Sequence, residues 1–340
     1  MYPCFRSLLF RLPPETAHTV TLQAIRLAGL LPPVRAFLAA WFRGPQLPVQ
    51  AFGLTFLNPI GLAAGYDKDA LSWKGLAALG FGHIEVGTVT PKPQPGNPHP
   101  RLFRLISERA VINRMGFPGR GAEFVRKQIP TVTNRKSSVI LGVNLGKNKD
   151  TPLERAADDY VGLVRTFAPL ADYLAINVSS PNTVGLRRLQ GREFLEGLLT
   201  AVDEERQRML AALGRCVPIL VKLAPDLTDA ELDDALEAIQ RTGMDGVIAT
   251  NTTIRRDGVY SPLASESGGL SGAPLREKST EMIRKIAVRT QGNLPIVGAG
   301  GISSAADVCE KLDSGATLVQ LYTGLIYEGP GLVKKILNEL

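Results

Sequence analysis

The sequence predicts an α/β protein, and more narrowly a (β/α)8 or TIM barrel with a small N-terminal helical extension. Three observations favour this fold class. Apolar, strand-like runs alternate with helical segments after residue 58, and polar or small residues follow nearly every run. The 340 residues are 44% hydrophobic and include 34 Gly and 24 Pro, which suits one large core with many short loops. We therefore expect an N-terminal segment over 1–44 and a single barrel domain over 45–340.

The expected elements follow one another in a regular order. Strand-like runs lie at 59–64, 81–87, 139–143, 172–178, 218–223, 246–250, 295–297 and 316–321. Helical segments lie at 152–167, 191–213, 228–242, 274–290 and 303–314, with Asp, Ser or Thr near their starts and Gly near their ends. An open, doubly wound sheet is the competing architecture. However, no GxGxxG motif follows the first strand, and the polar motifs are not confined to one switch point. Eight βα units close best into a barrel.

The first 44 residues form a basic, amphipathic segment, with five arginines against one glutamate. After the Pro32-Pro33 break, apolar residues recur at helical spacing, so we expect two short helices: the pattern comprises Val34, Phe37, Leu38, Trp41 and Phe42. Arg11, Pro13 and Pro14 interrupt the apolar run, which disfavours a cleaved signal peptide. The helices either cap the main core or form a membrane-surface patch with basic anchors, and both interpretations can hold together.

Composition disfavours several other classes of protein. Cys4, Cys216 and Cys309 form neither a CxxC pair nor a disulfide framework, so we expect a reducing compartment and no metal site. No stretch of about 20 apolar residues exists, so we expect no ordinary transmembrane helix. The net charge of +7 is spread along the chain without a nucleic-acid-binding motif. This charge predicts weak attraction to anionic surfaces, and we expect no nucleic-acid partner.

A polar cluster follows the apolar run at 172–178. It contains Asn177, Ser179, Ser180 and Asn182. Pro181 cannot prolong a strand ladder, so Ser180 should lie in a loop just beyond the carboxyl end of the strand, where barrel enzymes place their chemistry. The alternative is a turn that merely reverses the chain. The surroundings of the cluster favour a site.

Small or polar residues stand at the other strand ends as well. They include Ala64, Gly65, Lys68, Thr88, Asn144, Lys222, Thr250, Asn251, Thr252, Tyr322 and Thr323. A glycine loop at 298–303 opens a helix, and its backbone N–H groups can hold a phosphate; a tight turn is the alternative. A phosphate site, planar amides and the strand-end Lys222 together fit a flavin mononucleotide (FMN). An aldolase-type Schiff-base lysine and a salt-bridged lysine remain alternatives for Lys222.

Nine ordered motifs resemble the signature set of dihydroorotate dehydrogenase. They are AAGYDKD, GTVTPKPQPGNP, INRMGF, GVNLGKNKDT, INVSSPNT, VKLAPD, ATNTT, GGLSGAPL and GAGGI, and they extend over almost the whole chain. The serine of SSPNT and the N-terminal extension are similar to the membrane-associated, quinone-dependent class of this family (class 2). The soluble class carries cysteine as its base and lacks the extension.

The resemblance implies oxidation of dihydroorotate to orotate in pyrimidine (UMP) biosynthesis, with electrons passing through FMN to a ubiquinone-type quinone. It implies that Ser180 is the catalytic base. It implies FMN contacts from Ala64, Gly65, Tyr66, Asp67, Lys68, Thr88, Asn144, Asn177, Lys222, Thr250, Gly272, Gly301, Tyr322 and Thr323. The substrate would meet Lys68, Asn113, Arg114, Met115, Gly116, Phe117, Asn177, Asn182, Asn251 and Thr252.

The resemblance further implies that His18 and Arg104 are polar contacts at a quinone tunnel. It places the protein peripherally on the cytoplasmic face of the cell (inner) membrane, as a monotopic enzyme with no obligate protein partner. Three other functions remain open. A soluble dihydroorotate oxidase should lack the N-terminal segment, and a flavin-dependent tRNA dihydrouridine synthase should carry an RNA-binding extension. A non-enzymatic membrane-surface module would leave the polar strand ends unexplained.

Overall fold

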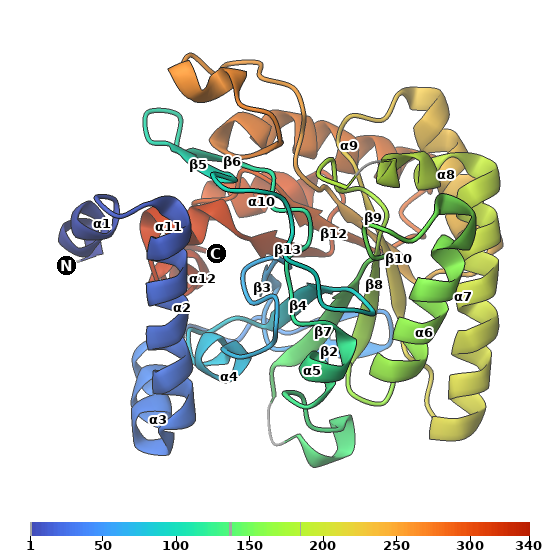
Figure 1. Ribbon diagram of the computed structural model, residues 1–340. Coiled ribbons are helices and arrows are strands. Elements are labelled where there is room, and N and C mark those ends of the chain that lie inside the picture. The colour runs from blue at the N-terminus through green and yellow to red at the C-terminus, as the bar shows by residue number, and fades with distance from the viewer. Residues whose placement is uncertain (1, 136–137, 184) are drawn as a thin grey trace.

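The computed structural model describes residues 2–135, 138–183 and 185–340. Its centre is a closed barrel of parallel strands (Figure 1). Around the barrel the strands are β3 (Ile60–Leu62), β4 (His83–Val89), β7 (Ile140–Leu145), β8 (Tyr173–Asn177), β9 (Ile219–Leu223), β10 (Gly246–Ala249), β12 (Ile296–Ala299) and β13 (Leu318–Leu321), which pairs with β3. The TIM barrel is therefore confirmed, and each expected strand run overlaps one of these strands.

Helices surround the barrel and bury one apolar face each against it. They are α4 (Trp73–Ala77), α5 (Ala122–Arg126), α6 (Ala156–Phe167), α7 (Arg192–Leu213), α8 (Asp229–Arg241), α9 (Arg276–Arg289), α10 (Ala305–Asp313), α11 (Thr323–Glu328) and α12 (Leu332–Glu339). The five expected helices appear as α6 to α10. Local signals at the helix starts explain this agreement. At the start of α8, the Thr228 side chain accepts a hydrogen bond from the Glu231 amide, and the Glu231 side chain accepts one from the Thr228 amide, which completes a capping box.

A short hairpin covers one end of the barrel. It consists of β1 (Val49–Ala51) and β2 (Leu54–Phe56), which pair antiparallel. Phe56 is fully buried and packs with Tyr173, Leu220 and Ile248 from the barrel interior. This end is therefore filled with apolar side chains, and the opposite end, where the strands finish, is left for a site.

Three further strands outside the barrel were not predicted, and neither were the two strands of the hairpin. The three further strands are β5 (Leu102–Leu105), β6 (Ala110–Asn113) and β11 (Gly269–Gly272), an antiparallel sheet in the order β11-β6-β5. Asn113 lies opposite Gly269 in this sheet, so two loops far apart in the sequence meet. The INRMGF and GGLSG motifs are brought side by side by this pairing.

The N-terminal segment contains three helices, so the prediction of two short helices was wrong. They are α1 (Tyr2–Leu9), α2 (Pro14–Leu30) and α3 (Pro32–Trp41), and they lie on the opposite side of the barrel from α6 to α8 (Figure 1). Pro14 and Pro32 each stand at a first helical position, where the missing N–H costs nothing, so each begins a new helix. The axes of α2 and α3 meet at 107°.

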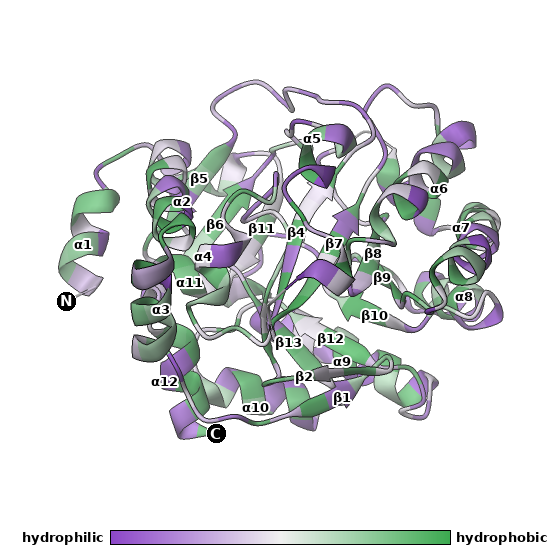
Figure 2. Ribbon diagram, turned by 90° about the horizontal axis from the view of Figure 1, so that it is seen from below, coloured by the Kyte–Doolittle hydropathy of each residue, from purple (hydrophilic) through white to green (hydrophobic). Residues whose placement is uncertain are grey.

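The apolar face expected for α3 is divided in the structure. Leu38 and Phe42 are half-buried toward the protein, while Val34, Phe37 and Trp41 are exposed. Figure 2 shows α1 and α3 as largely apolar helices at the edge of the molecule. The segment carries most of the exposed large hydrophobic side chains among the described residues. No single described helix is long and apolar enough to cross a membrane; α2 and α3 pass that test only as a bent pair.

Candidate active site

A cavity opens at the carboxyl ends of the barrel strands. It holds about 1060 Å³ of empty space, its mouth included, which is ample for a mononucleotide and a small substrate. Nineteen residues predicted from the sequence line it: Ala64, Gly65, Lys68, Thr88, Asn113, Met115, Gly116, Phe117, Asn177, Ser180, Asn182, Lys222, Thr250, Asn251, Thr252, Gly272, Gly301, Tyr322 and Thr323. The fold therefore gathers side chains from nearly every strand end at one place.

Two other predicted residues have side chains engaged outside this cavity. Arg114 forms an ion pair with Glu266 at 2.6 Å and lies over the Phe103 ring, 4.6 Å from its centroid. Tyr66 is buried and packs edge-on against His18, with ring centroids 5.1 Å apart. The Arg114 side chain thus packs against the outer sheet, formed by β5, β6 and β11. The Tyr66 side chain lines a second cavity, which lies beside the N-terminal helices.

Asp67 and Asn144 are also buried behind the cavity wall. The Asp67 carboxylate accepts hydrogen bonds from the Leu71 and Ser72 amides at 2.9 and 2.7 Å. Burial raises its pKa to about 6, against the lowering effect of these hydrogen bonds. Asn144 is fully buried in β7 and bonds to the residues that do line the cavity. The Asp67 side chain therefore holds the loop before α4, and the Asn144 side chain joins the ends of β4 and β8.

The floor of the cavity is a closed network of amides and hydroxyls. Thr88 Oγ1 donates to Asn144 Oδ1 at 2.6 Å, and Asn177 Nδ2 donates to the same oxygen at 3.0 Å. Asn251 Nδ2 donates to Ser179 Oγ at 3.0 Å. Because each amide is fixed by a partner, its remaining donor or acceptor points in a set direction. Such a floor suits a planar ligand with several hydrogen-bonding groups.

Glu85, in β4, was missed by the sequence analysis. Its side chain is fully buried and accepts hydrogen bonds from Asn144 at 2.8 Å and from Tyr173 and Gln320 at 3.0 Å each. Lys222 Nζ lies 3.9 Å from its carboxylate. The available signal was a lone acidic residue in the middle of the largely apolar segment HIEVGTV, where an unpaired buried charge would be costly.

Two lysines give the cavity a positive character. Burial lowers the pKa of Lys222, and the nearby Glu85 partly opposes this effect. Burial likewise lowers the pKa of Lys68 to about 8, against the charges of Glu15 and Asp69, and its Nζ donates to the Gly65 carbonyl at 2.6 Å. An anionic ligand would relieve the cost of burying both ammonium groups.

The glycine loop after β12 forms an anion cradle. Gly300 and Gly301 have φ of +124° and +74°, and a Cβ on Gly301 would lie 2.4 Å from the Arg276 backbone, so glycine is required there. Within the described part of the chain, the amides of Gly300, Gly301 and Ile302 find no acceptor. Unpaired amides beside a cavity can bind a phosphate group. The loop therefore fits the phosphate of a nucleotide cofactor.

Ser180 lies in the wall of the cavity and is 5% exposed. Its Oγ accepts a hydrogen bond from the Asn182 amide at 3.2 Å, and the Asn182 side chain donates to Asn113 at 3.0 Å. The buried Thr183 hydroxyl has no partner among the described residues. The serine loop is thereby joined to β6 through Asn182 and Asn113.

A second, mostly apolar cavity lies between the N-terminal helices and the barrel. It holds about 1490 Å³ of empty space, its mouth included, and its lining includes Ala28, Leu38, Phe42, Leu325 and Ile326. Tyr322 lines both cavities, so one aromatic ring stands between them. The rings of Tyr66 and Tyr322 meet edge-on at 5.7 Å. The resemblance implied a quinone tunnel here, but the extent of this cavity beneath α2 was not predicted.

Both residues expected at a quinone tunnel, His18 and Arg104, line the second cavity. Burial and the charge of Lys68 lower the pKa of His18 to about 3, so its imidazole is neutral at physiological pH. Arg104 donates to the Phe10 carbonyl at 3.1 Å and also to that of Leu12, which anchors the chain between α1 and α2.

The comparisons with known proteins identify the family. The family described as Dihydroorotate dehydrogenase matches residues 46–340. The chain belongs to the dihydroorotate dehydrogenase family. It is 52% identical to "Dihydroorotate dehydrogenase (quinone)" of Acidithiobacillus ferrooxidans, over 100% of this chain and 94% of that protein. The relative of the same description from Paraburkholderia phymatum is 50% identical, over 100% and 97%.

A solved dihydroorotate dehydrogenase structure also matches. The enzyme from Eimeria tenella, in complex with ferulenol, superposes with a TM-score of 0.87 and 38% sequence identity, covering 98% of this chain and 93% of that one. The family match, the barrel and the N-terminal helices agree. The resemblance expected from the sequence motifs is thus confirmed.

Proposed function

We propose that this member of the dihydroorotate dehydrogenase family divides its reaction between its two cavities. Dihydroorotate would be oxidised to orotate for pyrimidine (UMP) biosynthesis in the barrel cavity, and a quinone would collect the electrons from the apolar cavity. The observation that carries this proposal is the pair of cavities: one is polar and cationic, the other is apolar, and Tyr322 lines both. A membrane quinone and a small carboxylate need such opposite environments.

FMN fits the barrel cavity. Its phosphate would lie on the Gly301 loop and Thr323, and its ring near Gly65, Thr88 and Lys222. The predicted contacts at Tyr66, Asp67 and Asn144 remain proposals, and the side chains of all three are held behind the wall. When bound, FMN supplies hydride acceptance and electron transfer. The buried ammonium group of Lys222 would stabilise negative charge on the ring.

The substrate would occupy the part of the cavity beneath Ser180. Asn113, Asn182 and Asn251 offer amide donors and acceptors that match the imide groups of a pyrimidine, and Lys68 can pair with its carboxylate. Asn177 and Thr252 line the same cavity and would also contact the substrate. Residues 115–117 line the same part of the cavity, whereas the Arg114 side chain points to Glu266 and could contribute through its backbone.

Ser180 would be the catalytic base. It would take the proton from C5 of the substrate as the hydride departs from C6. A serine hydroxyl is a poor base, so its own proton must pass onward. The unpaired, buried hydroxyl of Thr183 in the same loop is suited to hold a water molecule for this transfer.

Residues 1–44 would form the quinone entrance and the membrane contact, and residues 45–340 the catalytic domain. A ubiquinone-type ring would reach His18 and Arg104, while the exposed apolar side chains of α1 and α3 would enter one leaflet. Basic residues flank these side chains, as expected for anionic lipid headgroups. We propose a peripheral, monotopic enzyme on the cytoplasmic face of the inner membrane.

The test is anaerobic mixing of the purified yellow protein with dihydroorotate, followed by a short-chain quinone. We expect the flavin absorbance to bleach in the first step and to recover in the second. A protein that stays colourless after incubation with FMN would refute the proposal. So would one that bleaches with dihydroorotate but cannot be reoxidised by any quinone.

A further inference from the structure

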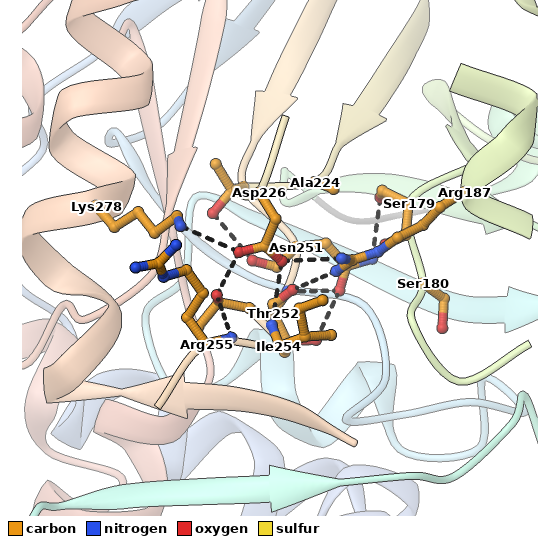
Figure 3. Close-up of polar contacts among 12 residues, drawn as sticks. Ser179, Ser180, Arg187, Ala224, Asp226, Asn251, Thr252, Ile254, Arg255 and Lys278 are labelled. Atoms are coloured by element: carbon orange, nitrogen blue, oxygen red, sulfur yellow. Dashed lines mark hydrogen bonds and ion pairs between the residues drawn. The ribbon is translucent and has the colours of Figure 1, made fainter. Parts of the chain in front are cut away.

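Arg187 ties together three loops at the mouth of the barrel. It belongs to a short 3-10 helix, Leu186–Gln190, that follows the Ser180 loop, and its side chain is 23% exposed. Figure 3 shows its guanidinium reaching the loops that follow β8, β9 and β10. Arg187 is not among the site residues predicted from the sequence. The resemblance motifs do not include it.

The first contact fixes the peptide next to the proposed base. Arg187 Nε donates to the Ser179 carbonyl at 3.1 Å, and this carbonyl belongs to the peptide unit that carries the Ser180 nitrogen. Ser179 Oγ also accepts from Asn251 at 3.0 Å. Rotation of the 179–180 peptide would swing the Ser180 side chain, so Arg187 restrains the direction in which Oγ points.

The second contact reaches the proposed substrate-binding loop after β10. Arg187 Nη2 donates to the Thr252 carbonyl at 2.9 Å. Thr252 and its neighbour Asn251 both line the barrel cavity. One guanidinium therefore sets the distance between the loop that carries the base and the loop that would hold the substrate.

The third contact anchors the guanidinium itself. Arg187 Nη1 lies 2.9 Å from Asp226 Oδ2, and Lys278 approaches the other oxygen at 3.2 Å from the opposite side (Figure 3). Thr253 Oγ1 and the Ile254 amide donate to the same carboxylate. Burial alone would raise the pKa of Asp226, but the hydrogen bonds from Thr253, Ile254 and Arg187 outweigh it and lower that pKa. The carboxylate is therefore a fixed, charged anchor.

We propose that Arg187 is a positioning residue that holds the Ser180 hydroxyl in line with the C5 hydrogen of the bound substrate. This inference rests on the proposed role of Ser180. It deepens that role, because the base alone does not fix its own direction. Misplacing a reacting group by about 1 Å costs on the order of 100-fold in rate, so three loop contacts through one side chain bear directly on catalysis.

Arginine suits this position because its planar fork donates in several directions at once. Lysine is a point charge on a flexible stem and can keep the Asp226 pair while losing the carbonyl contacts. The helix itself has another attachment: the buried Gln190 side chain accepts from the Ala224 amide at 2.9 Å. Variants at Arg187 should therefore keep the fold while releasing the 179–180 peptide.

The experiment compares Arg187→Ala, Arg187→Lys and Asp226→Asn with Arg188→Ala as the matched control. Arg188 occupies the next position of the same helix, is exposed, and makes no side-chain hydrogen bond within the described residues. Anaerobic flavin bleaching by dihydroorotate is timed in each variant, with and without millimolar guanidinium ion, and with substrate deuterated at C5. Reoxidation by a water-soluble acceptor and the melting temperature are recorded on the same samples.

We expect bleaching to slow by about 10- to 100-fold in the two Arg187 variants, within the range for a misplaced group. The isotope effect at C5 should rise, guanidinium should partly restore Arg187→Ala, and Asp226→Asn should show a smaller loss. Reoxidation should be unchanged, and Arg188→Ala should match the wild type. Bleaching within twofold of the wild type in both Arg187 variants would overturn the inference.

A slow Arg187→Ala with an unchanged isotope effect and no guanidinium rescue would also overturn it, because a purely structural role predicts that result. Ser180→Ala, measured alongside, separates the two proposals. If Ser180→Ala bleaches at the wild-type rate, the base is elsewhere and the proposed function of Ser180 fails. If Ser180→Ala is slow while Arg187→Ala is not, the Arg187 inference alone fails.

Discussion

The barrel mouth and the N-terminal segment differ in the kind of ligand surface that they offer. At the mouth, amides and hydroxyls such as Thr88, Asn144 and Asn177 are bonded to one another, so each remaining polar atom has a set direction. In the segment, exposed side chains such as Phe37 and Trp41 are held mainly by their helix. Proton and hydride transfer require fixed geometry, whereas a quinone tail requires apolar surface and room. The two regions should therefore respond to different mutations.

Two of the connections between the regions reach the proposed ligand sites. One is Tyr322, which lines both cavities. The other is Glu15 in α2, which accepts from Arg101 at 2.7 Å; Arg101 in turn donates to the Asn97 carbonyl at 3.0 Å. Asn97 Nδ2 donates to the Asn182 carbonyl at 3.1 Å. A chain of hydrogen bonds therefore runs from the N-terminal segment to the proposed substrate loop.

The largest expected effect belongs to the mouth. Ser180→Ala should keep FMN and bind orotate, but it should slow flavin bleaching by about 100- to 10,000-fold, the range for a positioned proton transfer. Reoxidation by quinone should not change, because the apolar cavity is untouched. Stopped-flow absorbance measures both steps. Equal slowing of bleaching and reoxidation would contradict the proposal that the two regions act in separate steps.

The next effect belongs to the segment. Ala28 lines the apolar cavity, whereas its neighbour Leu27 is 61% exposed and lies outside it. Ala28→Trp should fill the cavity and lower the rate of reduction of a long-tailed quinone by about tenfold or more, since overpacking displaces neighbouring groups. Flavin bleaching by dihydroorotate should stay normal. Leu27→Trp adds the same side chain on the same helix and should leave both steps unchanged; a loss there would contradict the proposed location.

The two regions should also differ in their pH dependence. Lys68 has a pKa lowered to about 8, so it is charged below that pH and neutral above it. The affinity for the orotate carboxylate should therefore fall as pH rises past 8, by up to about tenfold per pH unit. Lys68→Met should bind orotate weakly at every pH and abolish the slope. A titration of orotate at several pH values provides the measurement.

His18 gives the opposite expectation for the apolar cavity. Its pKa is lowered to about 3, so it stays neutral from pH 5 upward, and quinone reduction should show no step from it near its ordinary value of 6.5. The pKa of His18 is lower in the folded protein than in the unfolded chain, so the unfolded chain binds the proton more readily. The free energy of unfolding should therefore decrease as pH falls below about 6.5. Replacement by Gln should remove this part of the acid sensitivity. A step near pH 6.5 that disappears in His18→Gln would show that the imidazole titrates normally.

The smallest expected effect tests the link between the regions. Glu15→Gln should raise the KM for dihydroorotate several-fold, because Arg101 loses its charged partner and the Asn97 contact loosens. We expect a stability loss of about 1–3 kcal/mol, below that of a fully buried pair because Glu15 is partly exposed. Since the Glu15 charge raises the pKa of Lys68, orotate affinity should begin to fall at a lower pH. Arg11→Gln, an exposed charge change in the same segment, serves as control. An unchanged pH profile in Glu15→Gln would argue that the regions are independent.

Most of the barrel could be predicted because its signals are local. Each strand is an apolar run such as Ile219–Leu223, and helix starts such as Thr228 cap themselves with near neighbours. The outer sheet could not be predicted, since β6 pairs with β11 more than 150 residues later and neither strand shows the pairing. The break between α1 and α2 lay at Pro13-Pro14, which the sequence analysis used only against a signal peptide.

The candidate site was predictable to the extent that its residues stand at strand ends. Lys222 and Asn177 do, and they line the cavity. Glu85 and Arg187 do not, because one lies inside a strand and the other extends to three loops from a helix. Their roles depend on partners distant in the sequence, and only the folded chain brings those partners within hydrogen-bond distance.

In the proposed function, substrate and quinone use separate cavities divided by Tyr322. The most direct measurement is the rate at which pre-reduced protein is reoxidised by a long-tailed quinone as orotate is raised to saturation. If the cavities are separate, orotate should leave this rate unchanged even when the barrel cavity is full. A rate that falls in proportion to orotate occupancy would place both ligands in one cavity and contradict the proposed function.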